Sequence, residues 1–261
     1  MVRLMQRGFG IDANVPLEVA LEVADLVERA GYGSFWVNGS PHGGALDIIE
    51  GVLGRTALEV GVGVFPLTEI SADEIVAEVR ARNLAQPRLW LGVGSNRAPG
   101  ALDEVAVAVD RFRSELEVTV VMGAVGPKMM ALAGEVADVV VLTWSFVAEV
   151  ELARGLLEQA AARVDREVPP VASFIRCALV PQAAEAVRER ADAYDRIPRY
   201  REVFARYRLT AADTVVTGAN RAELVEGIER ESAVLDVPVI RAIPADDTVE
   251  SLAELVEACA P

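Results

Sequence analysis

The chain has 261 residues, of which 52% are hydrophobic and 25% are charged, and its formal net charge is −15 at pH 7. This composition excludes a disordered chain and is typical of a globular protein with a large core. The excess of acidic residues argues against nucleic acid as a partner, because phosphate backbones are bound by basic surfaces.

The few cysteines and histidines exclude further kinds of site. The two cysteines, Cys177 and Cys259, fit no metal-ligand or disulfide pattern, and His42 is the single histidine, so a zinc site built on several histidines is excluded. The apolar runs are too short to span a bilayer, which takes about 20 residues, and the first residues do not read as a signal peptide. We therefore expect a cytoplasmic protein with no membrane partner and no metal.

Short apolar runs alternate along the chain with stretches in which apolar residues recur at helical spacing. The runs predict eight strands, at residues 4–11, 34–37, 58–65, 88–93, 118–122, 139–142, 171–178 and 237–243. Most are almost continuously apolar, which is typical of parallel strands covered by helices. Helix starts are predicted at Ser71, Asn220 and Asp247, because each is followed three residues later by glutamate.

Eight strand–helix units predict a (β/α)8 TIM barrel, an α/β fold, as a single domain over residues 1–261. A doubly wound parallel sheet is the alternative, because the sequence does not show whether the sheet closes. Residues 181–236 predict a helical insertion between strands seven and eight. Its aromatic stripe consists of Tyr194, Ile197, Tyr200, Phe204 and Tyr207. The stripe either packs within the insertion or forms a lid or dimer surface near the barrel mouth.

The active site of a TIM barrel lies at the carboxyl ends of its strands. After the fifth predicted strand, Gly123-Ala-Val-Gly-Pro-Lys128 leads into a helix that begins near Pro127. Backbone N–H groups at a helix start favour an anion, most often phosphate, and Lys128 adds a positive charge. An ordinary strand-to-helix turn would also use glycine and proline, so both interpretations stay open.

The other strand ends are less specific. Gly92-Val-Gly94-Ser-Asn96 lacks the full dinucleotide-binding fingerprint, and Gly63 permits either a ligand or core packing close to the backbone. Trp36 and Trp144 end two strands, where an aromatic ring stacks on a ligand or packs in the core. No pair of carboxylates stands out at these ends, which favours a reaction whose chemistry is carried by a cofactor.

Several segments together carry a family resemblance. They are residues 28–37, 60–66 and 87–94 and, most specifically, Met122-Gly-Ala-Val-Gly-Pro-Lys-Met-Met-Ala-Leu-Ala-Gly-Glu-Val-Ala-Asp138. With them the chain resembles the bacterial luciferase-like superfamily of flavin- and deazaflavin-dependent oxidoreductases. Residues 138–144, 197–200 and 245–258 are similar to the actinobacterial branch that uses coenzyme F420, a deazaflavin.

The resemblance implies an oxidoreductase that transfers a hydride between coenzyme F420 and a small organic substrate. It implies cofactor contacts from Trp36, Gly63, Val64, Gly94, Ser95, Asn96, Gly123, Ala124, Gly126, Pro127, Lys128 and Met129. It places Phe65, Trp144 and Arg176 on the substrate side. Many relatives have a non-proline cis peptide after strand three, which would lie at Gly63–Val64 or Val64–Phe65 here.

One departure from the family bears on catalysis. Many relatives have an Asp-His pair after the strand-two tryptophan, where this chain has Gly39-Ser40. Ser40 and His42 are the catalytic candidates, with His42 either a proton-transfer group or a surface residue of the loop. An FMN-dependent luciferase-like monooxygenase and a non-catalytic flavin- or deazaflavin-binding protein are the alternative functions. A homodimer is compatible with the sequence.

Overall fold

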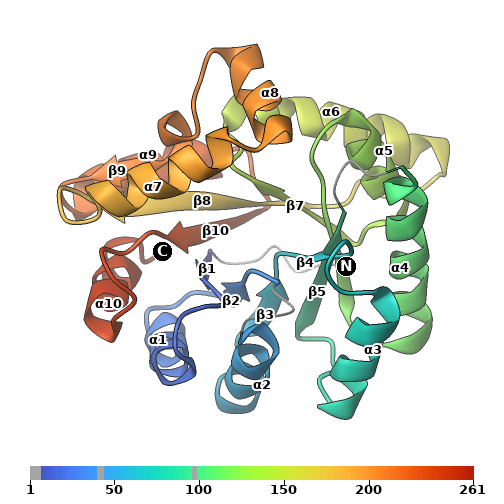
Figure 1. Ribbon diagram of the computed structural model, residues 1–261, viewed down its shortest axis with the longest axis horizontal. Coiled ribbons are helices and arrows are strands. Elements are labelled where there is room, and N and C mark those ends of the chain that lie inside the picture. The colour runs from blue at the N-terminus through green and yellow to red at the C-terminus, as the bar shows by residue number, and fades with distance from the viewer. Residues whose placement is uncertain (1–6, 40–43, 96–98) are drawn as a thin grey trace.

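The computed structural model describes residues 7–39, 44–95 and 99–261, which form a closed barrel of parallel strands (Figure 1). The eight barrel strands are β1 Gly8–Ile11, β2 Ser34–Val37, β3 Glu59–Val62, β5 Leu89–Gly94, β6 Thr119–Gly123, β7 Val139–Thr143, β8 Val171–Leu179 and β10 Val237–Ala242. Each pairs in parallel with the next, and β10 pairs with both β8 and β1. This closure confirms the TIM barrel and excludes the doubly wound sheet.

Ten α-helices of the described residues surround the strands. They are α1 Leu17–Arg29, α2 Ala45–Arg55, α3 Ala72–Ala81, α4 Ala101–Glu115, α5 Pro127–Val136, α6 Val147–Arg163, α7 Ala184–Asp195, α8 Pro198–Tyr207, α9 Arg221–Ser232 and α10 Val249–Ala258. In Figure 1, α8 lies on the opposite side of the barrel from α2. None of the helices in the described part of the chain is long and apolar enough to cross a membrane.

The predicted helix starts hold at two of three positions. Ser71 caps α3 in a reciprocal capping box with Glu74, and Asn220 accepts a hydrogen bond from the Glu223 backbone N–H. The start of α10 was predicted at Asp247 but is at Thr248, whose hydroxyl accepts from the Ser251 backbone N–H. Threonine and aspartate are both good N-cap residues. The sequence therefore does not show which of the two neighbouring residues caps the helix, and the path of the backbone decides it.

Two predicted segments differ from the observed elements. The third predicted strand ends at Val62, after which the Gly63–Val64 peptide is cis and a separate strand, β4 Phe65–Pro66, pairs with β5. The insertion at 181–236 is not wholly helical, because β9 Val216–Gly218 extends the sheet along β8. Residues 4–6 of the first predicted strand lie outside the described residues.

Bulky side chains fill the interior of the barrel. Trp36 is fully buried there, and its ring meets the rings of Trp90 and Phe174 edge-on, each at a centroid distance of 5.8 Å. The Trp36 Nε1–H donates to the hydroxyl of Ser34 at 2.9 Å, so its one polar atom is satisfied. With the interior packed, a ligand can bind only at an end of the barrel.

Candidate functional site

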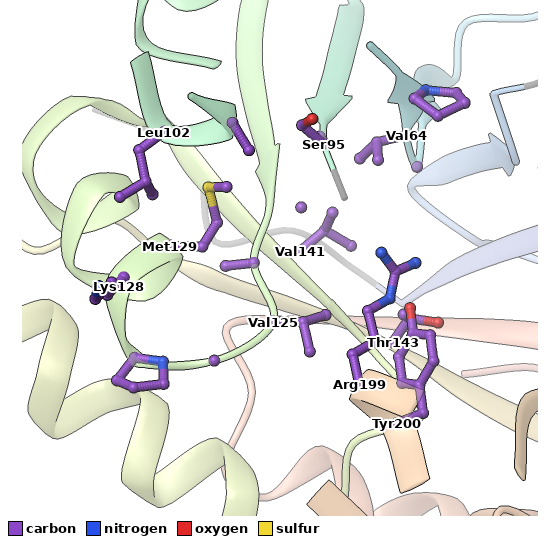
Figure 2. Close-up of a pocket in the computed structure, with 18 of the residues that line it drawn as sticks. Val64, Ser95, Leu102, Val125, Lys128, Met129, Val141, Thr143, Arg199 and Tyr200 are labelled. Carbon is purple, nitrogen blue, oxygen red and sulfur yellow. The ribbon is translucent and has the colours of Figure 1, made fainter. Parts of the chain in front are cut away.

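A cavity of about 790 Å³ opens at the carboxyl ends of the barrel strands (Figure 2). Its wall contains residues from the ends of β3, β5, β6 and β7 and from α4, α5 and α8. They include Gly63, Val64, Gly94, Ser95, Leu102, Gly123, Ala124, Val125, Gly126, Pro127, Lys128, Met129, Val141, Thr143, Phe174, Arg199 and Tyr200. Most of these side chains are apolar, and the volume lies in the range of roughly 300–1,000 Å³ that is typical of cofactor and ligand sites.

Val64 enters the cavity wall directly after the cis peptide. Its methyl groups fit between two strand-end glycines: a Cβ added to Gly94 would lie 2.9 Å from Val64 Cγ2, and one added to Gly123 would lie 3.1 Å from the same atom. A side chain at Gly94 would therefore force Val64 to shift, and one at Gly123 would require it to move by a few tenths of an ångström. The result is an apolar surface with backbone on both sides, suited to one face of a flat ring.

The helix α5 begins at the cavity wall. Gly126 caps it with φ of 83° and no neighbouring atom within 4 Å of an added Cβ, and Pro127 is its first residue. The first-turn N–H groups of Lys128 and Met129 have no acceptor within the helix. This arrangement is an open helix start of the kind that binds a phosphate group. The side chain of Lys128 is exposed.

The helix α8 covers the other side of the cavity. Figure 2 shows Arg199 and Tyr200 beside Thr143, across the cavity from Lys128. The aromatic stripe of α7 and α8 packs on Trp144, which follows β7, and on Phe146, the N-cap of α6. The ring centroids are 4.6 Å apart for Trp144–Tyr194 and 4.8 Å apart for Phe146–Tyr207. The stripe thus packs against the barrel and at the same time brings two residues of α8 to the cavity.

The structure brings most of the predicted cofactor residues to one cavity. Those on its wall are Gly63, Val64, Gly94, Ser95, Gly123, Ala124, Gly126, Pro127, Lys128 and Met129. It does not bring Trp36 there, because the strand register turns that ring into the barrel core. The predicted substrate residues Phe65 and Trp144 are also buried off the wall, at 1% and 2% exposure. Asn96, Ser40 and His42 lie outside the described residues.

Arg176 lies behind the wall. Its Nη2 donates to Thr143 Oγ1 at 2.9 Å, and its guanidinium carbon lies 3.7 Å from the centre of the Trp144 ring. Burial lowers the pKa of Arg176 to about 9. Trp144 has φ of 54°, a left-handed conformation that turns the chain after β7. The predicted pair Trp144 and Arg176 therefore forms one stacked unit next to the cavity.

Arg241, which the sequence analysis missed, lies beside Arg176 on the neighbouring strand β10. Its Nη2 donates to Asp12 Oδ2 at 3.0 Å and to Asn38 Oδ1 at 3.2 Å. The signal was available: Arg241 interrupts an apolar strand, as Arg176 does. Among the described residues, no group of three or more His, Cys, Asp or Glu is placed to hold a metal ion.

A sequence model of the family described as luciferase-like monooxygenase matches residues 54–258, most of the chain. The chain belongs to this family. The resemblance carried by the loop at Gly123–Lys128 is thereby confirmed at the level of the family. No curated protein matches the sequence.

Solved structures share the fold of this luciferase-like chain at low sequence identity. An F420-dependent secondary alcohol dehydrogenase, in complex with an F420-acetone adduct, is 17% identical with a TM-score of 0.77, covering 97% of this chain and 98% of its own. The coenzyme F420-dependent tetrahydromethanopterin reductase from Methanopyrus kandleri is 12% identical with a TM-score of 0.69 and 98% coverage of both chains.

An FMN complex is among the similar structures as well. The oxygenating constituent of 3,6-diketocamphane monooxygenase from Pseudomonas putida, a type II Baeyer-Villiger monooxygenase, is 12% identical with a TM-score of 0.65 and 98% coverage of both chains. The luciferase-like chain is thus an enzyme of a family whose structural neighbours are oxidoreductases and monooxygenases, some with F420 and some with FMN.

Proposed function

We propose that this luciferase-like enzyme is a coenzyme F420-dependent oxidoreductase that transfers a hydride between the deazaflavin and a small organic substrate. One observation carries the proposal: a single cavity joins the apolar Val64 surface to the open helix start at Gly126. A tricyclic ring with a phosphate-bearing tail needs these two features together, because the ring is flat and apolar and the phosphate is anionic.

The residues present fit such a cofactor. At Gly94 and Gly123 the wall has no side chain to obstruct a ring lying on Val64, and at Gly126 the backbone is open to an approaching phosphate. We assign the phosphate to the N–H groups of Lys128 and Met129, with Gly123, Ala124 and Pro127 shaping the loop. We assign the ring and its tail to Gly63, Val64 and Ser95.

The protein binds and orients both reactants. When bound, the deazaflavin supplies the ring carbon that gives or takes the hydride. Val64 fixes the depth of the ring, since its methyl groups are themselves held between Gly94 and Gly123. Arg199 and Tyr200 of α8 cover the cavity and keep water from the reacting atoms, which protects a hydride from loss to solvent.

Two features of the comparisons support F420 over FMN. Two F420 enzymes have TM-scores of 0.77 and 0.69, against 0.65 for the FMN complex, and the segments 138–144 and 197–200 are similar to the F420-using branch. The family description and the FMN complex favour the second candidate, an FMN-dependent monooxygenase.

Side-by-side titration of the purified protein with F420 and FMN separates the two candidates. The proposal predicts saturable F420 binding at least about tenfold tighter than FMN binding, a difference of about 1.4 kcal/mol. Tighter FMN binding, with oxygen consumption when reduced FMN is supplied, would establish the monooxygenase instead. If the protein binds neither cofactor, both candidate functions are excluded.

A further inference from the structure

The uppermost layer of the barrel interior is polar, although the layers below it are apolar. Along each strand, every second side chain points into the barrel. On β8 and β10 the inward series runs from Phe174 and Val239 to Arg176 and Arg241, and the last two are register partners. The two arginines thus lie side by side above the Trp36–Phe174 core, at the end of the barrel that opens to the cavity.

This layer holds more positive than negative charge. Within residues 7–39, 44–95 and 99–261, Asp12 is the one carboxylate bound there, with Arg241 at 3.0 Å and Arg190 of α7 at 3.8 Å. Arg176 has no carboxylate partner among the described residues. It contacts instead the neutral hydroxyl of Thr143 and the face of the Trp144 ring.

Each of the two arginines has an N–H group that finds no acceptor among the residues that the structure describes. Arg176 is 7% exposed and Arg241 is 8% exposed, and the Nη1 atom of each has no hydrogen-bond partner within the described parts of the chain. A buried charged donor without an acceptor is costly. Burial lowers the pKa of both groups, and for Arg176 the neighbouring positive charge of Arg241 lowers it further.

We propose that Arg176 and Arg241 bind an anionic oxygen group of the substrate, a carboxylate or a phosphate. This inference deepens the proposed function and rests on it for the identity of the ligand as a substrate. An oxyanion that reaches the Nη1 groups of both arginines would accept from both and would balance the excess charge. Because α7 and α8 cover the layer, the substrate is a small acid or small phosphate ester.

The anion site borders the place assigned to the cofactor ring. Thr143, which accepts from Arg176, lines the cavity, and so does Phe174. Gly63, at the cis peptide before Val64, lies so close to Phe174 that an added Cβ would be 2.4 Å from the ring. The helix start assigned to the cofactor phosphate is across the cavity, as the separation of Lys128 from Thr143 in Figure 2 shows. The two anion sites are therefore distinct.

The test measures anion binding without any cofactor, so that it does not depend on F420 or FMN. Thermal unfolding is followed with acetate, inorganic phosphate and the neutral analogue acetamide, at constant ionic strength. Variants are Arg176→Met, Arg241→Met and, as a control with the same charge change, Arg163→Met on α6, whose side chain is 56% exposed. Phosphate and other salts stabilise proteins in general, so the readout is the difference between the wild type and each variant.

We expect acetate or phosphate to raise the Tm of the wild type and of Arg163→Met, with a response that saturates as the anion concentration increases. At an anion concentration of one hundred times Kd, the rise should be about 5 °C or more. Acetamide should have no such effect, and both buried-arginine variants should lose the acetate response. A phosphate response that both variants keep belongs to the helix start of α5. The anion whose response falls more in the buried-arginine variants identifies the substrate group. Equal responses in the wild type and in Arg176→Met would overturn the proposal, whatever the cofactor titration gives. Saturable anion binding without binding of either cofactor would instead remove the proposed function, and with it the assignment of the anion to a substrate.

Discussion

The guanidinium carbon of Arg176 lies 3.7 Å above the centre of the Trp144 ring. This stacking holds a buried positive charge behind the cavity wall, and no carboxylate in the described part of the chain pairs with it. A cation on an aromatic face keeps most of its capacity to attract an anion, whereas a salt bridge would neutralise it. The arrangement has consequences for stability that differ between the two neighbouring arginines.

Arg176→Met should leave the free energy of unfolding unchanged or raise it by about 1–2 kcal/mol, because replacing an uncompensated buried charge by an apolar side chain is often stabilising. Arg241→Met should lower it by about 1–3 kcal/mol, because among the described residues Asp12 would then keep two hydrogen bonds from Asn14 and, as its cationic partner, Arg190 at 3.8 Å. Urea unfolding of both variants measures the difference. Equal losses in the two would contradict the charge distribution described above.

The affinity for acetate should fall as pH rises through 9, because the pKa of Arg176 is about 9 and the neutral guanidine attracts an anion less strongly. Between pH 7.5 and 9.5 we expect a decrease of about fourfold. The other ionisable groups facing Arg176 are Arg241, Arg190, Tyr194 and Tyr200, and burial raises the pKa of Tyr200, which stays neutral.

The deprotonation of Arg176 also changes the free energy of unfolding, and the direction of that change follows from its pKa. The unfolded chain keeps an ordinary arginine pKa, so above about pH 9 it binds more protons than the native state, and the free energy of unfolding gains a contribution that rises with pH. Comparison of the wild type with Arg176→Met isolates this contribution.

For the acetate prediction, the contradicting outcome is an affinity that stays constant from pH 7.5 to 9.5, because it would show that Arg176 does not titrate in that range.

Gly94→Ala should weaken cofactor binding by about tenfold, because the new Cβ would lie 2.9 Å from Val64 Cγ2 and would displace that side chain into the cavity. Combination with Val64→Ala removes the contact and should restore part of the affinity, with a coupling energy of about 1–2 kcal/mol. Gly54→Ala, at an exposed helical glycine with open space, is the matched control. Additive effects of the two substitutions would argue against a role for Val64 in the ring site.

Trp36→Phe should lower the free energy of unfolding by about 1–2 kcal/mol and leave cofactor affinity within about twofold of the wild type. The reason is its position: the ring is fully buried among Trp90 and Phe174 and does not reach the cavity. Chemical denaturation and cofactor titration on the same preparation check both expectations. A loss of cofactor affinity with an unchanged free energy of unfolding would contradict this and would indicate that Trp36 contacts the cofactor.

The sequence predicted the barrel well because each strand is apolar over nearly its whole length. Such a run is recognised without knowing which strands become neighbours. It predicted the loop at Gly126 because glycine and proline mark a helix start locally. The family resemblance placed a cis peptide at Gly63–Val64 or Val64–Phe65, and the structure has it at Gly63–Val64. The end of β3 at Val62 was not predicted, since the residues on both sides of Gly63 continue the apolar run. Only the pairing of β4 with β5 makes it visible.

The parts that were missed depend on which strands become neighbours. Arg176 and Arg241 are register partners although β9 and three helices separate them along the chain. Trp36 ends a strand, as an aromatic at a barrel mouth would, but the direction of its side chain follows from the register of β2. Arg199 reaches the cavity only because the α7–α8 stripe packs on Trp144.

The central claim is that the helix start at Gly126 binds the cofactor phosphate, and the most direct test is cofactor titration of Gly126→Trp against Gly31→Trp. Gly126 and Gly31 share positive φ values, 83° and 88°, and both have open space at Cβ, but Gly31 does not line the cavity. Both substitutions therefore put a side chain at a positive φ with open space around it, and they differ in whether the position lines the cavity. We predict that Gly126→Trp loses F420 binding by at least about a hundredfold while Gly31→Trp binds like the wild type. Equal affinity in the two variants would contradict the claim.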